Sequence, residues 1–339
     1  MNGPPAPAAG PLLAVEHLEV CFATAHGLVP VVTDVSFTVD PGEVVGLVGE
    51  SGCGKSVTSL AVMGLIPDPP GRITGGRITF EGDELTALGN AAMQRRRGNR
   101  LAMVFQEPMT SLDPAFTVGE QIASTYRRHR GGTKREAWDR AIEMLDLVGI
   151  PGAKARAGDH PHAFSGGMRQ RVVIAIALVC SPSLLIADEP TTALDVTIQA
   201  QVLDLLRDLQ QRLGMAIVFV SHDLGVVSEL CDRVLVMYAG EVVETAPARR
   251  LFDAPRHPYT SGLIACRPSE RPGTTLRPIP GTVPAAGALP EGCHFHPRCA
   301  HAELGRCDTT AVELLDVAPG RSARCVRTAE LQLPGVAPP

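Results

Sequence analysis

The sequence predicts an α/β protein, in which a parallel sheet carries an inserted helical subdomain and is followed by a smaller C-terminal extension. Three observations lead to this fold class. Residues 12–50 alternate between apolar runs and turn signals, the pattern becomes helical and more polar between about 114 and 164, and helix and strand then alternate again up to residue 245. The 339 residues, 45% of them hydrophobic, suffice for one large domain with an appendage.

The first predicted elements are strands. The segments 12–22 (LLAVEHLEVCF) and 31–40 (VVTDVSFTVD) alternate apolar and polar residues, which indicates an antiparallel edge sheet. The run VVGLV at 44–48 is apolar throughout, as in a buried parallel strand. The stretch 56–66 (SVTSLAVMGLI) then has helical spacing, and a segment rich in proline and glycine ends it at 67–71.

The later part of the chain divides into a helical insertion, a core and an extension. Helices are predicted at 117–130 (TVGEQIASTYRRHR) and 134–150 (KREAWDRAIEMLDLVGI). Beyond about residue 250 proline becomes frequent, and 271–292 has the composition of an extended connector. We therefore expect a flexible tail at 1–11, a main domain at 12–250 with its helical subdomain at about 114–164, and an extension at 251–339.

The composition of the chain excludes some classes of function. A net charge of -5 and a pI near 6.1 argue against a general affinity for nucleic acid, whose phosphates bind clustered positive charge. The first eleven residues lack the features of a signal peptide, and the longest apolar run, 172–180, is too short to span a bilayer, so we expect a soluble cytoplasmic protein. Its nine cysteines should be reduced, which makes metal ligation a better explanation for a cysteine group than disulfides.

The octapeptide GESGCGKS fits the pattern G-x-x-x-x-G-K-[ST] between a predicted strand and a predicted helix. In such a loop backbone N–H groups surround phosphates, Lys55 reaches the β- and γ-phosphates, and the Ser56 hydroxyl binds Mg²⁺. A chance glycine-rich turn is the alternative, and the strand and helix on either side disfavour it. The candidate nucleotide-binding residues are Gly49, Glu50, Ser51, Gly52, Cys53, Gly54, Lys55 and Ser56.

Two carboxylates follow the apolar run at 184–187. Asp188 ends this predicted strand and can hold Mg²⁺ through its water shell. Glu189 alternates to the other side of the strand, where it is placed to polarise an attacking water. Taken alone, the sequence Asp-Glu-Pro is equally well explained by an ordinary turn at the end of a strand.

A second helix start that could bind an anion lies at 165–171 (SGGMRQR). Ser165 can cap this helix, and the glycines expose its first N–H groups. A plain capped helix is the alternative. The candidate residues are Ser165, Gly166, Gly167, Met168, Arg169 and Gln170.

These motifs resemble those of the ABC ATPases and occur in the order of that family. The segment 165–171 resembles the signature motif, Gln106 the Q-loop glutamine, Asp195 the D-loop aspartate and His222 the switch histidine. The resemblance covers residues 12 to about 330. It implies a P-loop NTPase fold of the ABC type, with an antiparallel edge sheet.

The resemblance also implies a mechanism. ATP is bound between two such domains, so that the phosphate loop of one faces the signature helix of the other. Glu189 is the base, His222 contacts the γ-phosphate, and Phe22 is the candidate aromatic residue that stacks on adenine. The implied Mg²⁺ ligands are Ser56 and Gln106, with Asp188 behind them.

Within the family, the chain is similar to the dipeptide and oligopeptide importers at 106–114 (QEPMTSLDP), at Met168 and at 257–260 (HPYT). Met168 and a C-terminal group of four cysteines favour the D-type ATPase of a D/F heterodimer. The implied partners are an F-type ATPase, two transmembrane permeases and an extracytoplasmic peptide-binding protein, with the chain at the cytoplasmic face of the membrane. Nickel, opine and glutathione importers share much of this pattern and remain alternatives for the cargo.

The C-terminal cysteines are Cys293, Cys299, Cys307 and Cys325. Their spacing matches neither the usual zinc pairs nor the common ferredoxin motifs, so it names no ligand. D-type ATPases carry a similar module, which in some members is associated with a [4Fe-4S] cluster. This resemblance implies a cluster here, while zinc and four unligated thiols remain open. We expect ligation to fold residues 293–325 separately from the nucleotide-binding core.

Two other functions are possible for such a chain. An ABC ATPase that acts on the ribosome or on DNA would carry a second domain or long heptad coiled coils, and the sequence has neither an internal repeat nor heptads. A regulatory module without hydrolysis would not need a base or a switch histidine, and both Glu189 and His222 are present. The sequence therefore predicts an ATPase that drives transport.

Overall fold

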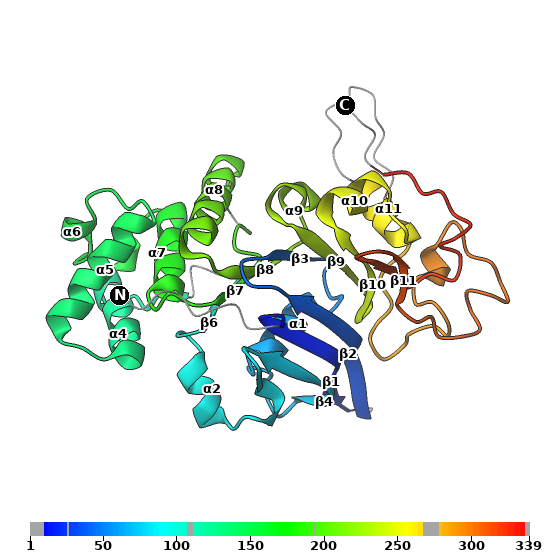
Figure 1. The fold of residues 1–339 in the computed structure, drawn as a ribbon, viewed down its shortest axis with the longest axis horizontal. Coiled ribbons are helices and arrows are strands. Elements are labelled where there is room, and N and C mark those ends of the chain that lie inside the picture. The colour runs from blue at the N-terminus through cyan, green and yellow to red at the C-terminus, as the bar shows by residue number, and fades with distance from the viewer. Residues whose placement is uncertain (1–9, 26, 107–110, 193, 267–277, 336–339) are drawn as a thin grey trace. The chain divides into compact units, whose positions relative to one another are not determined.

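The computed structural model describes residues 10–25, 27–106, 111–192, 194–266 and 278–335. The chain divides into two compact units, each assembled from separate segments (Figure 1). The first comprises Met1–Leu12, Val39–Glu43 and Ala87–Val218, and the second comprises Leu13–Thr38, Val44–Thr86 and Phe219–Pro339.

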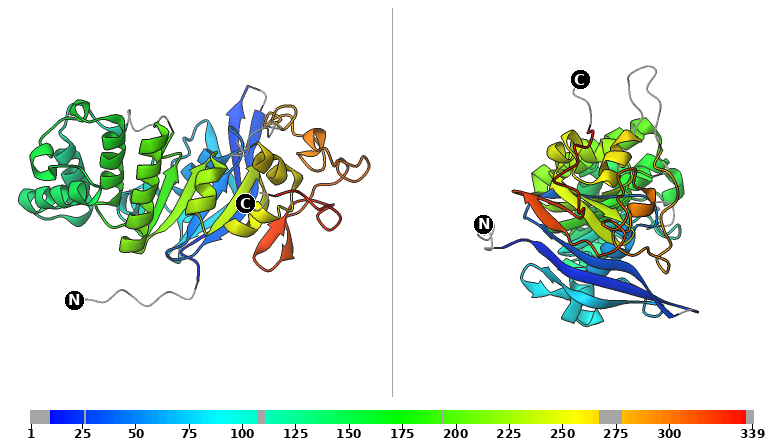
Figure 2. Two further views of the ribbon diagram at one scale, coloured as in Figure 1. Left: turned by 90° about the horizontal axis from the view of Figure 1, so that it is seen from above. Right: turned by 90° about the vertical axis from the view of Figure 1, so that its right-hand side faces the viewer.

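An antiparallel sheet forms one part of the second unit, as the alternating segments predict (Figure 2). Its strands, in spatial order, are β2 (Gly27–Val39), β1 (Leu13–Thr24), β4 (Gly71–Phe80) and β5 (Asp83–Glu84). The buried residues of β1 change from Leu13 and Val15 to Leu18 and Val20, because the pairing with β4 shifts register between these two pairs. A bulge therefore keeps both ends of β1 facing the core.

The second unit also contains a mixed sheet. Its strands, in spatial order, are β11 (Leu315–Ala318), β12 (Arg321–Ala323), β10 (Glu241–Pro247), β9 (Arg233–Tyr238) and β3 (Val44–Val48). Strands β3 and β9 are parallel, and every residue of β3 is buried, as its continuous apolar run predicts. Helix α9 (Leu224–Leu230) packs closely on β3, since a Cβ atom at Gly46 would lie 2.9 Å from Val227.

The C-terminal extension falls within this second unit. Strands β11 and β12 lengthen the mixed sheet beyond β10. The carboxylate of Glu244, which is fully buried in β10, accepts hydrogen bonds from the backbone N–H groups of Arg256 and His257 and from the guanidinium of Arg321. The extension is therefore fastened to the sheet through a buried carboxylate. Its helices are α10 (Ala248–Asp253), α11 (Pro258–Ala265) and the short 3₁₀ helix η3 (His296–Arg298).

The first unit combines parallel strands with helices. Strands β6 (Leu101–Val104) and β7 (Leu184–Asp188) are parallel, and β8 (Ala216–Ser221) begins in this unit and ends in the other. The helices, in chain order, are α2 (Asn90–Arg96), α4 (Val118–Arg130), α5 (Lys134–Leu147), α6 (Ala153–Arg156), α7 (Gly166–Leu178) and α8 (Val196–Leu213).

The predicted helical subdomain is confirmed as α4, α5 and α6. Capping boxes begin both long helices: Thr117 and Glu120 bond reciprocally at the start of α4, and Thr133 and Glu136 do so at the start of α5. Gly131, with φ of 73°, ends α4. No helix in the described part of the chain is both long and apolar enough to cross a membrane.

Candidate functional site

The phosphate loop joins β3 to α1 (Lys55–Val62) in the second unit, as predicted. Gly49 has φ of 153°, and a Cβ atom there would lie 2.3 Å from the carbonyl oxygen of Met237, so only glycine fits. Gly54, with φ of 105°, occupies the N-cap of α1 and has no side chain that could cover the helix start. The first N–H groups of α1 are therefore not capped by a side chain, which suits an anion site.

Lys55 directs its ammonium group into this loop. Its Nζ donates to the carbonyl oxygens of Gly49 at 2.8 Å and Glu50 at 3.0 Å, and the residue is 5% exposed. Burial raises the pKa of the adjacent Cys53 thiol, and Lys55 acts in the opposite direction. The loop thus holds a buried cation in its centre, with the half-buried Ser56 next to it on α1.

Sequence reasoning missed two residues that contact the loop. The hydroxyl of Tyr259 accepts a 2.9 Å hydrogen bond from the backbone N–H of Glu50. The guanidinium of Arg298 pairs with the Glu50 carboxylate through two bonds, of 2.7 and 3.0 Å. Both residues come from the C-terminal extension, and no sequence signal connects them with position 50 because they lie more than 200 residues away.

In the first unit, Gln106 and Glu189 lie together. Gln106 Nε2 donates to Glu189 Oε2 at 3.1 Å, and the hydroxyl of Thr192 donates to the same oxygen at 2.9 Å. Glu189 has φ of 46°, so the chain leaves β7 in a left-handed conformation at this residue. Contrary to our expectation, Glu189 therefore does not continue the alternation of the strand. Asp188, the last residue of β7, is 5% exposed.

The signature residues begin α7. Ser165 is the N-cap by backbone geometry, but within the described residues its side chain makes no capping hydrogen bond. Gly167 lies against α8, because a Cβ atom there would be 2.5 Å from Ile198. Ser165 and Gly166 are exposed, so this helix start is open to solvent. Gly167, Met168 and Arg169 are half-buried, and Gln170 is fully buried.

The other predicted site residues lie at the end of a strand, at the start of a helix or on the antiparallel sheet. Asp195 caps α8 by accepting from the N–H of Ile198 at 2.9 Å. His222 is exposed directly after β8. The half-buried ring of Phe22 lies on Gly71, its partner across β1 and β4. Two parts of the predicted motifs lie outside the described residues: Ala193, two positions before the D-loop Asp195, and residues 107–110, which follow Gln106.

The four C-terminal cysteines lie around one pocket. Cys293, Cys299, Cys307 and Cys325 line one small pocket together with His257, His296 and His301. Burial, together with the negative charge of the three other cysteines, raises the pKa of Cys293 to about 12. Burial also raises the pKa values of Cys299 and Cys325.

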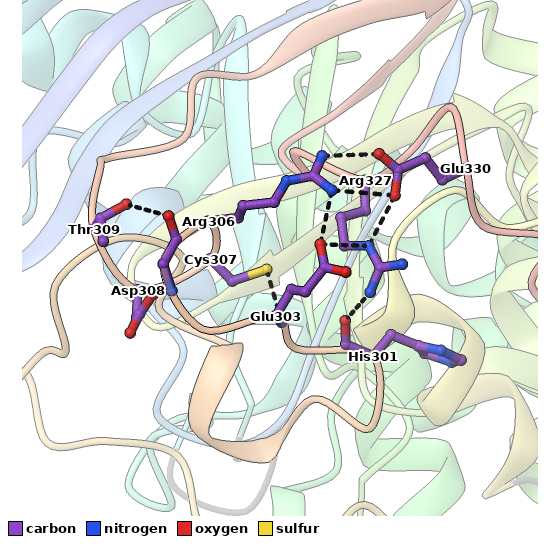
Figure 3. A network of polar contacts seen from close by, with 9 residues as sticks. His301, Glu303, Arg306, Cys307, Asp308, Thr309, Arg327 and Glu330 are labelled. Carbon is purple, nitrogen blue, oxygen red and sulfur yellow. Dashed lines mark hydrogen bonds and ion pairs between the residues drawn. The ribbon is translucent and has the colours of Figure 1, made fainter.

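Each of these sulfurs accepts a backbone N–H. The donors are Phe295 for Cys293, His301 for Cys299, Glu303 for Cys307 and Arg327 for Cys325. Two of these donors, Glu303 and Arg327, also belong to an ionic network with Arg306 and Glu330 (Figure 3). Within the described ranges, however, no group of three or more cysteine, histidine, aspartate or glutamate side chains is placed to hold a metal ion. The expected cluster therefore has no metal site in the described part of the chain.

Comparison with known proteins agrees with this set of motifs. Residues 32–192 match the ABC transporter family, and residues 243–307 match the C-terminal region of oligopeptide/dipeptide transporters. A putative peptide import ATP-binding protein of Brucella abortus (strain 2308) is 50% identical over 95% of this chain and 98% of its own length. The oligopeptide transport ATP-binding protein AppD of Bacillus subtilis (strain 168) is 50% identical over 93% of this chain and 96% of its own length.

Solved structures lead to the same class. The dimeric ATP-binding cassette MJ0796, in a post-hydrolysis state bound to ADP and Pi, matches with a TM-score of 0.62 and 26% identity over 70% of this chain and 99% of that one. CbiO1 of Clostridium perfringens, part of an ABC transporter complex, matches with a TM-score of 0.61 and 26% identity over 71% of this chain and 90% of that one. The fold and the motifs thus define an ABC-type ATPase.

The chain belongs to the ABC transporter family, among the ATP-binding proteins that carry the C-terminal region of oligopeptide and dipeptide transporters.

Proposed function

We propose that this chain hydrolyses ATP to energise the import of dipeptides or oligopeptides, as a peripheral subunit at the cytoplasmic face of the membrane. The observation that carries the proposal is the combination of a phosphate loop closed around Lys55 with a C-terminal region of the oligopeptide/dipeptide transporter type. The relatives from Brucella and Bacillus, which are described as peptide import and oligopeptide transport proteins, support the cargo class. Nickel, glutathione or opine import is the alternative for the same ATPase.

The reaction is phosphoryl transfer to water, and each motif supplies one part of it. The phosphate loop and Lys55 bind and neutralise the β- and γ-phosphates. Glu189 accepts the proton of the attacking water, and the bonds from Gln106 and Thr192 hold its carboxylate in one orientation. His222 contacts the γ-phosphate, and Phe22 stacks on adenine.

Magnesium is the ion that oxygen donors of these types prefer. Ser56 and Gln106 would hold the ion, with the buried carboxylate of Asp188 behind them, and such neutral and anionic oxygens are the ligands that Mg²⁺ prefers. When bound, the ion would neutralise negative charge on the phosphates.

The exposed start of α7 favours action in a dimer. Its N–H groups are not capped by Ser165 and form a second anion site in a chain that already has a phosphate loop. We assign this helix start to the ATP of a second ATP-binding subunit. That subunit is a related F-type chain, and two permeases and an extracytoplasmic peptide-binding protein complete the transporter. Mass measurement of the purified assembly separates a heterodimer from a homodimer.

The cysteine pocket is proposed to bind a [4Fe-4S] cluster. The proposal is supported by the convergence of the four thiols and by the N–H donors to their sulfurs, because such hydrogen bonds stabilise anionic sulfur ligands. Because the described side chains are not placed to hold a metal ion, binding of a cluster would require the cysteines to rearrange. Protein purified without oxygen should contain about four irons per chain with sulfide. Colourless protein with stoichiometric zinc would show that the cysteines bind a metal but not a [4Fe-4S] cluster. Protein without any metal would reject both the cluster and metal ligation.

Transport assays test the main proposal. In liposomes with the permeases, the second ATPase and the binding protein, ATP hydrolysis should rise when a peptide is supplied to the binding protein. Lys55→Ala should abolish both hydrolysis and uptake. Stimulation by nickel or glutathione in place of peptides would reassign the cargo, and hydrolysis that Lys55→Ala does not affect would reject the ATP site.

A further inference from the structure

Glu50 is attached to its surroundings at three separate groups. Its backbone N–H donates to the hydroxyl of Tyr259, its carbonyl oxygen accepts from Lys55, and its carboxylate binds Arg298. The neighbouring glycines give the loop little conformational preference of its own. Because two of the three attachments come from the C-terminal extension, the extension constrains the conformation of the phosphate loop.

Arg298 is itself held rigidly. It is 7% exposed, its Nε donates to the carbonyl oxygen of Pro280 at 2.8 Å, and its Nη1 donates to the hydroxyl of Tyr238 at 3.4 Å in addition to Glu50. The guanidinium lies 5.7 Å from the ring centroid of Tyr238 and 6.0 Å from that of Phe295. A guanidinium fixed in this way presents two parallel donors to the carboxylate in one geometry.

The same arginine is part of the cysteine module, which is residues 293–325. It ends η3 and directly precedes Cys299. Phe295, at the start of η3, donates its backbone N–H to the sulfur of Cys293 and packs its ring against Tyr238 and Tyr259. A displacement of either cysteine would therefore move the partner of Glu50.

The opposite charges of Arg298 and Glu50 suggest what their contact does for ATP binding. An unpaired carboxylate in a loop that binds phosphates repels them, and a buried cation beside the carboxylate removes the repulsion. We propose that Arg298 is a positioning residue for ATP, which orients and neutralises Glu50 and so makes ATP affinity depend on the cysteine module. This inference rests on the proposed ATP site at residues 49–56.

A set of variants tests the proposal, with ATP affinity and steady-state hydrolysis measured on the full chain. Arg298→Gln should weaken ATP binding and raise KM about tenfold while kcat stays within about twofold, because positioning affects binding rather than the chemical step. Arg306→Gln is the matched control: it removes an exposed arginine of the same module that bonds Glu303 and Glu330 and makes no contact with Glu50 (Figure 3). Its ATP affinity should equal that of the wild type.

The double variant Glu50→Gln with Arg298→Gln distinguishes charge compensation from general damage. Removing the unpaired carboxylate should restore ATP affinity to within about threefold of the wild type. Affinity in the double variant as low as in Arg298→Gln, or an equal loss in Arg306→Gln, would overturn the proposal. If Arg298→Gln does not fold, Arg298→Lys decides: we expect a loss of about threefold, since the charge stays and the paired donors go, and wild-type affinity would reject the proposal.

ATP binding by Lys55→Ala distinguishes a failure of this inference from a failure of the proposed function. Normal ATP binding by Lys55→Ala would mean that the ATP site itself is wrongly assigned. Loss of binding in Lys55→Ala together with wild-type binding in Arg298→Gln would leave the ATP site in place and reject only the role of Arg298.

Discussion

The side-chain amide of Gln106 donates a 3.1 Å hydrogen bond to the carboxylate of Glu189, which follows β7 in a left-handed conformation. The two residues are 83 positions apart in the chain, and Thr192 donates to the same carboxylate oxygen. A carboxylate that accepts from these two donors is fixed in orientation. This arrangement suits a base that must act on one particular water.

Replacing Glu189 with glutamine should stop turnover and preserve ATP binding. The amide has the same shape but cannot accept the proton of water, so we expect hydrolysis to fall at least about a hundredfold with ATP affinity almost unchanged. Glu143→Gln, on an exposed position of α5, is the control and should behave as the wild type. Wild-type hydrolysis by Glu189→Gln would show that another group is the base.

Ser165→Arg should abolish hydrolysis at the partner's ATP and spare ATP binding to the phosphate loop of its own chain. The change places a bulky cation at the exposed start of α7, where the proposed dimer brings the second ATP. It is best measured in a dimer that carries the change in one chain, with Gln211→Arg on an exposed position of α8 as the control. Undiminished hydrolysis at the opposite site would contradict the shared-site arrangement.

Cys299→Ser should weaken ATP binding as well as loosen the extension. From the sequence we expected residues 293–325 to fold separately from the nucleotide-binding core, but the structure links the residue before Cys299, Arg298, to Glu50 in the phosphate loop. Hydrogen exchange should therefore accelerate at residues 293–325, and the ATP dissociation constant should rise several-fold. Cys21→Ser, outside the pocket, controls for the loss of a thiol. Faster exchange with unchanged affinity would restore the original expectation.

Acid should destabilise the protein through His257. Burial lowers the pKa of this histidine from 6.5 to about 3. Between these pH values the unfolded chain binds a proton that the folded protein does not, so the free energy of unfolding falls as pH drops below about 6.5. At pH 5 this amounts to roughly 2 kcal/mol.

Urea unfolding of the wild type and of His257→Asn at pH 7.5 and pH 5 measures this effect. The asparagine oxygen can replace Nδ1 as acceptor for the N–H of Tyr259, so the variant should lose about 2 kcal/mol less than the wild type between the two pH values. Burial raises the pKa of Glu244, which acts in the opposite direction but does so in both proteins. Equal losses in the two proteins would exclude His257 as the cause.

Local sequence was sufficient for the parts of the site that a single segment forms. The phosphate loop needs glycine at positions 49 and 54 because of their positive φ angles, and the apolar run of β3 places the loop at the end of a buried strand. The capping boxes at Thr117 and Thr133 likewise mark the starts of α4 and α5. Each of these features depends on residues within one turn or strand of each other.

Contacts between segments that are distant in the chain could not be predicted from the local sequence. The register shift in β1 depends on how the strand pairs with β4, and the pairs Gln106–Glu189 and Glu50–Arg298 depend on how whole elements pack. The metal expectation illustrates the same limit: the cysteine count predicted a group, and the fold brings the thiols to one pocket, but their placement within the described residues is not that of a metal site.

By itself the sequence determined the class of this protein, because the phosphate loop, the signature helix start and the Asp188–Glu189 carboxylates are short motifs whose backbone geometry their own residues dictate. Only the tertiary structure showed that the C-terminal extension contacts the phosphate loop. The Arg298 guanidinium reaches Glu50 because β11 and β12 join the sheet at β10 and the buried Glu244 fastens the extension there. Side-chain spacing along the chain carries no information about such a contact, since packing across 248 residues sets the distance.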